Sequence, residues 1–392
     1  MMVKTKLMVI GLVAVLASAG VYAAINFDDR GNDGGDGERT LTDLFGNEFT
    51  VGKVDRLVVD WGMAMRWVSY MGQDVIDSIV GARVTKQSLN TGDLPYSYLK
   101  FPDDYTYLSS INQNNYEGIV ELNPDLVVFC GWSNLSDDTI TFIKNLKAVG
   151  IPTCLIKSIS DVRDDDFGRQ LTLLGKVFGK EEQARRVVDG TARYIRDLSK
   201  RLDGVSGEVN VYVGGVGFNG PHTFLGTNVE YNSFNYLDSK KVINVAKVVK
   251  PSASYGVMME WDDIYNAQKD PGIDICMLDL DGFKLTAEDY RKNPAVYNQV
   301  NAIREVGFHY SIPHTHNGTI IENTIIGAYI IGSLAYPDAF KDIDVNKVAE
   351  EVWALFYGSD EAGDLIYKGM SRHVTSLTGT EDAGVSGLLK TL

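Results

Sequence analysis

The sequence is short of positive charge. Its 37 lysine and arginine residues stand against 52 aspartate and glutamate residues, which gives a formal net charge of −15. Because a nucleic-acid partner requires clustered basic side chains, this balance argues against nucleic-acid binding. An acidic surface is instead typical of a soluble domain that has to stay dispersed outside a cell.

Only three cysteines occur, Cys130, Cys154 and Cys276. Each lies at or inside an apolar, strand-like run, and an odd number leaves at least one thiol unpaired. We therefore interpret all three as buried thiols and expect neither a disulfide framework nor a cysteine metal cluster. Since no cysteine lies near the N-terminus, a lipid-modified cysteine anchor is not expected.

Two catalytic signatures are missing from the sequence. There is no Gly-x-Ser-x-Gly elbow, so a Ser-His-Asp triad is not supported. There is no His-Glu-x-x-His motif, and without such partners a catalytic zinc site is not expected. We predict a protein that is not an enzyme, with an exported metal-dependent hydrolase as the competing alternative.

The N-terminus has the features of an export signal. Lys4 and Lys6 precede an apolar run and a small-residue triplet, Ala-Ser-Ala. The run is also nearly long enough to span a bilayer, so residues 1–25 are predicted to be a signal peptide or a membrane anchor. Residues 26–39, rich in glycine and aspartate, are typical of a solvated linker. The rest of the chain is expected to be extracytoplasmic, in a periplasm or at a cell surface.

Short β-branched runs alternate with helical patterns after the linker. The runs that predict strands, each bounded by Gly, Pro or Asp, are residues 55–60, 124–130, 151–157, 208–215 and 272–279. Helical patterns between them predict an α/β fold of two Rossmann-like lobes with mainly parallel sheets. We place the N-terminal lobe at residues 40–159 and the C-terminal lobe at residues 206–392.

One long helix is predicted between the lobes. From Lys180 to Leu202 apolar residues recur at steps of three and four, which predicts an amphipathic helix of about 35 Å. We assign residues 160–205 to this bridging region and expect a single rigid helix to limit hinge motion. Residues 319–337 are apolar nearly all round, and at that length they predict a buried core helix.

A glycine-rich segment, GGVGFNGPH at residues 214–222, follows a predicted strand. It contains the G-x-G-x-x-G spacing of a dinucleotide-binding turn, but Pro221 and Gly226 do not start the helix that such a turn requires. We favour the alternative that these glycines let the backbone approach a ligand closely at the carboxyl end of a strand.

Three of the five histidines, His309, His314 and His316, fall within residues 307–319. His314 and His316 are two residues apart in a predicted loop, so both imidazoles face one side and are candidate metal ligands. His309 or His222 are candidate further ligands. The alternative is a set of solvent-exposed loop histidines.

Two tryptophans follow predicted strands, Trp61 after Asp60 and Trp132 after Cys130. In open α/β sheets ligands bind at the carboxyl ends of the strands. Together with the loop of residues 217–222 on the other lobe, these indoles indicate an aromatic ligand cleft between the lobes.

Four segments, in this order, resemble a known family. They are RTLTDLFGNEFTVGKVDRLVV (39–59), NNYEGIVELNPDLVVF (114–129), LLGKVFGKEEQARRVV (173–188) and NTIIGAYIIGSLAYPDAFKDID (323–344). From about residue 40 to about residue 357 the chain is similar to the class III, helical-backbone substrate-binding proteins of ABC transporters. That family captures ferric siderophores, haem or vitamin B12.

The resemblance implies a receptor whose ligand lies between the lobes, touched by loops at strand ends. Matched segment by segment, the implied ligand-binding residues are Trp61, Met63, Trp132, Phe218, His222, Phe224, His314, His316 and Asn317. It implies no intrinsic cofactor and a metal chelate as cargo, either an iron–siderophore, haem or a corrinoid. His314 and His316 would then meet a metal only through a metal-bearing cargo. A carrier of bare Zn²⁺ or Mn²⁺ is the alternative.

The resemblance also implies a docking partner. In this family each lobe offers an exposed glutamate to the transmembrane subunits of an ABC permease, which works with an ATPase. The matching positions are Glu117, in NNYEGIV, and Glu260, in YGVMMEWDDI.

Overall fold

The computed structural model describes residues 37–60, 62–89, 94–131, 135–316 and 318–370. The predicted signal or anchor and most of the predicted linker lie outside the described residues, as do Trp61, Trp132 and Asn317. Among the described residues, no helix combines the length and the apolar character needed to cross a membrane.

A five-stranded parallel sheet forms the first half of the structure, in the order β5-β4-β3-β6-β7. Its strands are β3 (Leu57–Val59), β4 (Ile79–Ala82), β5 (Thr106–Tyr107), β6 (Leu126–Gly131) and β7 (Thr153–Lys157). An antiparallel hairpin of β1 (Arg39–Thr42) and β2 (Glu48–Val51) precedes it. All three residues of β3 are 0% exposed, as expected for a central strand covered by helices on both faces.

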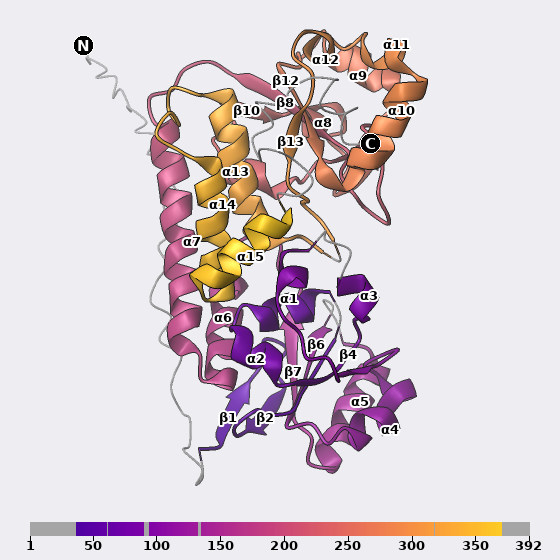
Figure 1. The fold of residues 1–392 in the computed structure, drawn as a ribbon, viewed down its shortest axis with the longest axis vertical. Coiled ribbons are helices and arrows are strands. Elements are labelled where there is room, and N and C mark those ends of the chain that lie inside the picture. The colour runs from indigo at the N-terminus through magenta and orange to yellow at the C-terminus, as the bar shows by residue number, and fades with distance from the viewer. Residues whose placement is uncertain (1–36, 61, 90–93, 132–134, 317, 371–392) are drawn as a thin grey trace, which may run out of the picture. The chain divides into compact units, whose positions relative to one another are not determined.

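Helices connect the strands of this sheet (Figure 1). They are α1 (Met63–Ser69), α2 (Gln73–Asp77), α3 (Lys86–Leu89), α4 (Tyr116–Glu121) and α5 (Asp137–Ala148), with 3-10 turns η1 (Pro95–Tyr98) and η2 (Gln113–Asn115). A further helix, α6 (Asp165–Phe178), follows the last strand, β7. Local chemistry sets the ends of α6. The Asp164 carboxylate accepts a hydrogen bond from the Asp166 N–H, and Gly179 ends the helix at a φ of 66°.

Helix α7 (Glu181–Leu202) follows α6 and precedes the second sheet in the chain. Its 22 residues correspond to about 33 Å, with glutamates in the first turn and basic residues in the last, which suits the helix dipole. It packs against α6 and two C-terminal helices, α13 (Ile321–Ala335) and α14 (Val345–Tyr357) (Figure 1). The predicted helix is confirmed, and its effect on hinge motion stays a prediction.

A four-stranded parallel sheet forms the second half, in the order β10-β8-β12-β13. Its strands are β8 (Val209–Gly214), β10 (Val242–Asn244), β12 (Ile275–Asp279) and β13 (His309–Ser311). A small antiparallel pair, β9 (Gly226–Asn228) and β11 (Gly256–Met258), lies beside β8. The predicted α/β class with parallel sheets is therefore confirmed. β13 was not predicted, so His309 belongs to a strand and not to the loop.

Short helices cover this second sheet, and three longer ones end the described chain. The short ones are η3 (Asn232–Tyr236), α8 (Val245–Val249), α9 (Trp261–Ala267), η4 (Leu280–Gly282), α10 (Phe283–Lys292), α11 (Pro294–Tyr297) and α12 (Asn301–Glu305). The last three are α13, α14 and α15 (Asp360–Met370). α13 is buried from Ile321 to Gly332, which confirms the predicted core helix.

The C-terminal helices share one hydrophobic core with helices of the first sheet. Trp67 of α1 lies 5.7 Å from Phe167 of α6, between ring centroids. Tyr70, which caps α1, lies edge-on to Phe356 of α14 at 4.9 Å. The sequence-based boundaries group α13 to α15 with the C-terminal lobe, and those boundaries stay a prediction. The packing shows that the same helices also complete the core of the first sheet.

The three cysteines are free thiols, as predicted. Cys154 and Cys276 are buried in strands, and Cys130 is half-buried at the end of β6. Burial, with a smaller contribution from the charge of Asp60, raises the pKa of the Cys130 thiol to about 12.

Candidate functional site

The predicted site residues lie where strands end. Met63 begins α1 just after β3, Phe218 and His222 follow β8, and His314 and His316 follow β13. Because the carboxyl ends of parallel strands are the ligand-binding edge of an open α/β sheet, these positions fit the expected place of a site. We name residues 312–316 and 318–320 the histidine loop and residues 215–222 the glycine loop.

The histidine loop touches the start of α1. Gly318 has a φ of +93°, and a Cβ atom placed on it would lie 2.9 Å from the Met63 Sδ. A side chain at this position would be conformationally strained and would require the Met63 side chain to shift. Two of the predicted ligand-binding segments, from the two halves of the chain, are therefore in direct contact.

The same loop also contacts the glycine loop. The Thr315 hydroxyl donates a hydrogen bond to the Gly217 carbonyl at 2.5 Å. Within the loop, the His316 N–H donates to the Gly318 carbonyl at 3.0 Å, and the Ile320 N–H donates to the His314 carbonyl at 2.9 Å. The histidine loop is thus a tight turn that joins three predicted ligand-binding segments.

His314 is packed inside the structure. It is 1% exposed, and its ring stacks on Tyr231 with 3.9 Å between centroids. Its Nε2 accepts a hydrogen bond from the Asn232 N–H at 3.3 Å, which puts the proton of the neutral ring on Nδ1. Burial lowers the pKa of His314 to about 3, so the imidazole is neutral at pH 7. We therefore leave the His314 ring out of the ligand-contacting set.

A buried carboxylate fixes the backbone of the histidine loop. Asp279, at the end of β12, is 0% exposed and accepts a hydrogen bond from the His314 N–H at 3.0 Å. The Tyr231 hydroxyl contacts the same carboxylate at 3.3 Å and the Ser311 hydroxyl at 2.8 Å. Burial raises the pKa of Asp279 well above its ordinary value.

His222 and His316 keep partly exposed side chains. The His222 Nε2–H donates to the Phe218 carbonyl at 2.8 Å, and its ring lies 4.1 Å from the Phe218 ring, between centroids. In the described ranges no group of three or more His, Cys, Asp or Glu residues is placed to hold a metal ion. The predicted metal role through a metal-bearing cargo therefore stays a prediction for His316, while the buried ring of His314 is not placed for it.

Phe218 lies over β11, because a Cβ atom on Gly256 would come within 2.3 Å of the Phe218 ring. Next to it, Tyr255 is 45% exposed and hydrogen-bonds the Thr315 side chain. Tyr255 was missed from the sequence, where it stands in an irregular Ser-Ala-Ser-Tyr-Gly stretch with no periodic pattern. Phe218, Tyr255 and Thr315 thus meet on one side of the histidine loop.

Phe224 has a different place from the one predicted. It is 0% exposed and packs 4.9 Å from Tyr212 and 5.2 Å from Phe308, between ring centroids. These rings belong to the core of the second sheet. We therefore treat Phe224 as a core residue that supports the glycine loop.

The first sheet contributes an ion pair at the same type of edge. Arg83 follows β4 and its guanidinium lies 3.5 Å from the carboxylate of Asp60, which follows β3. The Arg83 side chain is 40% exposed. It was missed from the sequence because the short strand β4 was missed, and it supplies a cation beside the predicted Trp61 segment.

The glycine loop brings backbone close to other groups, while its predicted close approach to a ligand stays a prediction. Its neighbours, however, are protein atoms, since a Cβ on Gly217 would overlap the carboxylate of Asp281 and one on Gly215 would meet Leu278. Residues 221–225 form loop and turn, and β9 begins at Gly226. The chain therefore lacks the helix that a dinucleotide-binding turn places after its third glycine.

The two predicted docking glutamates are both exposed at helix N-termini. Glu117 lies in the first turn of α4. Glu260 is the N-cap of α9, where its N–H donates to the Asp263 carboxylate at 2.8 Å. Helix N-termini favour negative side chains, which is sufficient reason for glutamates at these positions. Their docking role stays a prediction.

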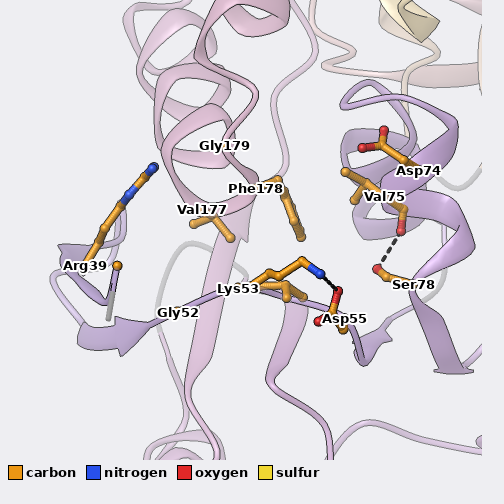
Figure 2. A pocket seen from close by; sticks show the side chains of 12 residues that line it. Arg39, Gly52, Lys53, Asp55, Asp74, Val75, Ser78, Val177, Phe178 and Gly179 are labelled. Atoms are coloured by element: carbon orange, nitrogen blue, oxygen red, sulfur yellow. Dashed lines mark hydrogen bonds and ion pairs between the residues drawn. The ribbon is translucent and has the colours of Figure 1, made fainter. Parts of the chain in front are cut away.

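One cavity of about 500 Å³ is lined by none of these residues. Figure 2 shows the residues that line it. It is formed by the β1–β2 hairpin, α2 and the end of α6, with Val75, Val177 and Phe178 among its apolar lining. Its charged groups are already paired, such as Lys53 with Asp55 at 2.8 Å. Because it is far from the strand ends that carry the site, we do not identify it as the ligand site.

Comparisons with known proteins agree with this architecture. Residues 51–234 match the family model described as periplasmic binding protein. No curated protein matches the chain.

Solved structures resemble the chain over most of its length. A periplasmic solute-binding protein of Veillonella parvula is 18% identical and covers 84% of this chain and 96% of its own, with a TM-score of 0.61. The molybdate-bound MolA of Haemophilus influenzae is 16% identical and covers 82% and 98%, with a TM-score of 0.59. CeuE of Helicobacter pylori, as a Ni–His complex, is 17% identical and covers 83% and 97%, with a TM-score of 0.53. At these identities the likeness establishes the fold.

Proposed function

We propose that this chain, residues 51–234 of which match the periplasmic binding protein model, captures a metal chelate outside the cytoplasm and delivers it to an ABC permease. The predicted resemblance to solute-binding proteins of ABC transporters is confirmed, and the similar solved structures described above are binding proteins. The proposed cargo is an iron–siderophore, haem or a corrinoid. The proposed partners are the permease transmembrane subunits and their ATPase.

One observation carries the proposal, which is the meeting of three strand-end segments at the histidine loop. Met63 contacts Gly318, and Thr315 hydrogen-bonds Gly217. The contacts bring segments from both sheets to one place, where the family's ligand is expected. Trp61, Trp132 and Asn317 remain proposed members of this site.

The side chains around these contacts suit a large, partly planar chelate. Those that are at least partly exposed are Met63, Phe218, His222, Tyr255 and His316. Thioether and aromatic groups offer apolar contact area, while an imidazole or a phenol offers a hydrogen bond or an axial ligand to a chelated metal. Arg83 adds a cation for the carboxylates or catecholates of an anionic chelate.

The absorption spectrum of the protein purified from its native host tests the cargo. We expect a coloured protein whose chromophore and metal are present at one equivalent, because ferric chelates and tetrapyrroles absorb visible light. Colourless protein with one equivalent of Zn²⁺ or Mn²⁺ would instead favour the bare-metal carrier. Protein that binds neither a chelate nor a metal at one equivalent contradicts both.

Two aromatic variants locate the cargo. Phe218→Ala and Tyr255→Phe are expected to weaken binding of the purified chromophore, by about 1–3 and about 0.5–1.5 kcal/mol respectively. Tyr107→Phe is the control, since Tyr107 is 53% exposed on the short strand β5 and belongs to none of the three segments. Equal affinities for all four proteins would remove the glycine loop and β11 from the site.

Charge reversal tests the proposed permease docking. Glu117→Lys with Glu260→Lys is expected to abolish transport in reconstituted vesicles while cargo affinity stays unchanged, because two carboxylates would orient the receptor over the pore. Glu121→Lys with Asp262→Lys is the matched control, with the same charge change on the same two helices. Transport that persists in the first double variant would reject this role for the glutamates.

A further inference from the structure

A buried arginine holds the histidine loop. Arg66 of α1 is 1% exposed, and its two terminal nitrogens donate to the carbonyls of Thr319 at 2.7 Å and His316 at 2.9 Å. These carbonyls lie more than 200 positions further along the chain. Arg66, on the helix that follows β3 of the first sheet, therefore fixes the backbone of the histidine loop, which follows β13 of the second sheet.

The surroundings balance the arginine's charge. Glu322, in the first turn of α13, is 0% exposed and accepts hydrogen bonds from the hydroxyls of Tyr70, at 2.5 Å, and Tyr357. Burial alone lowers the pKa of the Arg66 guanidinium, but the attraction of acidic groups around it, Glu322 among them, raises that pKa above its ordinary value. The guanidinium thus stays charged in the core.

The two polar groups link four elements into one unit. Arg66 belongs to α1 and Tyr70 caps that helix, Glu322 lies in the first turn of α13 after the histidine loop, and Tyr357 ends α14. Without the guanidinium, the His316 and Thr319 carbonyls would lose their donors in a region that excludes water. The loop backbone would then have to turn these carbonyls elsewhere, and Gly318 would leave its contact with Met63.

We propose that Arg66 is a positioning residue that sets the conformation of the histidine loop and couples it to the Met63 end of α1. A change at either segment is transmitted to the other through the guanidinium. This inference deepens the proposed function, since it makes the two proposed ligand-contacting segments move together. It concerns the protein alone and holds for any cargo.

Hydrogen exchange and methyl NMR on the full-length protein without cargo test the coupling. In Arg66→Met, the amides of His316 and Ile320, which donate within the loop, should exchange at least tenfold faster than in the wild type. The Met63 ε-methyl resonance, assigned through Met63→Leu, should shift because its contact with Gly318 is lost. Arg66→Lys should restore part of the protection, since an ammonium still reaches one carbonyl.

Arg201→Met is the matched control. Arg201 is also largely buried, at 15% exposure, and its guanidinium bonds Asp342 at 2.7 Å and the Ala339 carbonyl at 3.1 Å, away from the histidine loop. This variant should lower the melting temperature and leave the loop amides and the Met63 methyl unchanged. A general loss of stability is thereby separated from a specific effect on the loop.

Unchanged loop exchange and an unchanged Met63 resonance in Arg66→Met would overturn the inference. If Arg66→Met does not fold, Arg66→Lys serves as the test. Faster hydrogen exchange confined to the loop amides of Arg66→Lys would support the coupling, and exchange as slow as in the wild type would reject it. Neither readout uses a ligand. A colourless protein would therefore contradict the proposed cargo and leave this result standing.

Discussion

The cores of the two sheets differ in what lies at their centres. The core shared by the first sheet and the C-terminal helices encloses Arg66 and Glu322, both almost fully buried. The core of the second sheet is a cluster of rings around Phe224, which meets Tyr212 and Phe308 edge-on. An aromatic core accepts several packings of similar energy, whereas a buried hydrogen-bond network is satisfied by one. The junction between segments is thus specified by polar contacts.

Glu322→Ala should break the polar core and have the largest effect on stability. The free energy of unfolding should fall by about 3–5 kcal/mol, because Arg66 would be left as an uncompensated buried charge and two tyrosines would lose their acceptor. Urea unfolding followed by circular dichroism measures this loss. A loss below about 1 kcal/mol would mean that the network adds no more than an ordinary hydrogen bond.

His314→Phe should change the response to acid. The pKa of His314 is about 3 in the folded state, below its ordinary value of 6.5 in the unfolded chain. Between these two pH values the unfolded chain binds one proton more than the folded chain, so the free energy of unfolding falls as the pH falls. From pH 8 to pH 5 the wild type should lose about 2 kcal/mol more than the variant, whose ring can still stack on Tyr231. The raised pKa of Asp279 has the opposite effect on the pH dependence of stability. Because Asp279 is present in both proteins, its effect cancels when the two pH profiles are compared. Parallel pH profiles would contradict the burial of a neutral imidazole.

Phe224→Leu tests the aromatic core, where a milder response is expected. Loss of ring contacts should cost about 1–2 kcal/mol of unfolding free energy, since leucine fills part of the space. Exchange at the His316 and Ile320 amides should stay as in the wild type. If this variant loosens the histidine loop as strongly as Arg66→Met does, the two cores are not separable in the way described.

Arg185→Ala should have the smallest effect on the free energy of unfolding. Arg185 pairs with Asp189 at 3.2 Å on the exposed face of α7, and both side chains are about two-thirds exposed. Such a pair contributes about 0.3–0.5 kcal/mol at low salt. Thermal unfolding at low and high ionic strength should detect almost no difference from the wild type, and a loss comparable to Phe224→Leu would show that α7 depends on its surface charges.

The elements with strong periodicity could be predicted from the sequence. The apolar repeat of residues 180–202 predicted α7, and the continuous apolar run of residues 319–337 predicted α13. Both predictions succeeded because the residues that a helix buries recur at regular intervals in the local sequence. The strands at 124–130 and 151–157 were found for the same reason. The three-residue strand β13 is too short to leave such a pattern, so His309 was grouped with the loop.

The contacts that define the candidate site could not be predicted in this way. Arg66 has the pattern of an ordinary helix residue, and its partners are carbonyls of a distant loop, which no side-chain pattern encodes. The burial of His314 depends on Tyr231, more than 80 positions before it. The histidine side chain alone indicated a metal ligand at His314. In the structure its ring instead stacks on Tyr231 and accepts a hydrogen bond from the Asn232 N–H.

The burial of the thiols has a kinetic consequence for a chain that reaches an oxidising compartment. Disulfide exchange proceeds through the thiolate, and with a pKa of about 12 only about one Cys130 thiol in 10⁵ is ionised at pH 7. Cys154 and Cys276, at 0% and 1% exposure, are also out of reach of an oxidant. The folded chain therefore resists oxidation, whereas the unfolded chain presents all three sulfurs. Folding has to finish before the oxidants of the compartment act, and slow-folding variants should accumulate as cross-linked material.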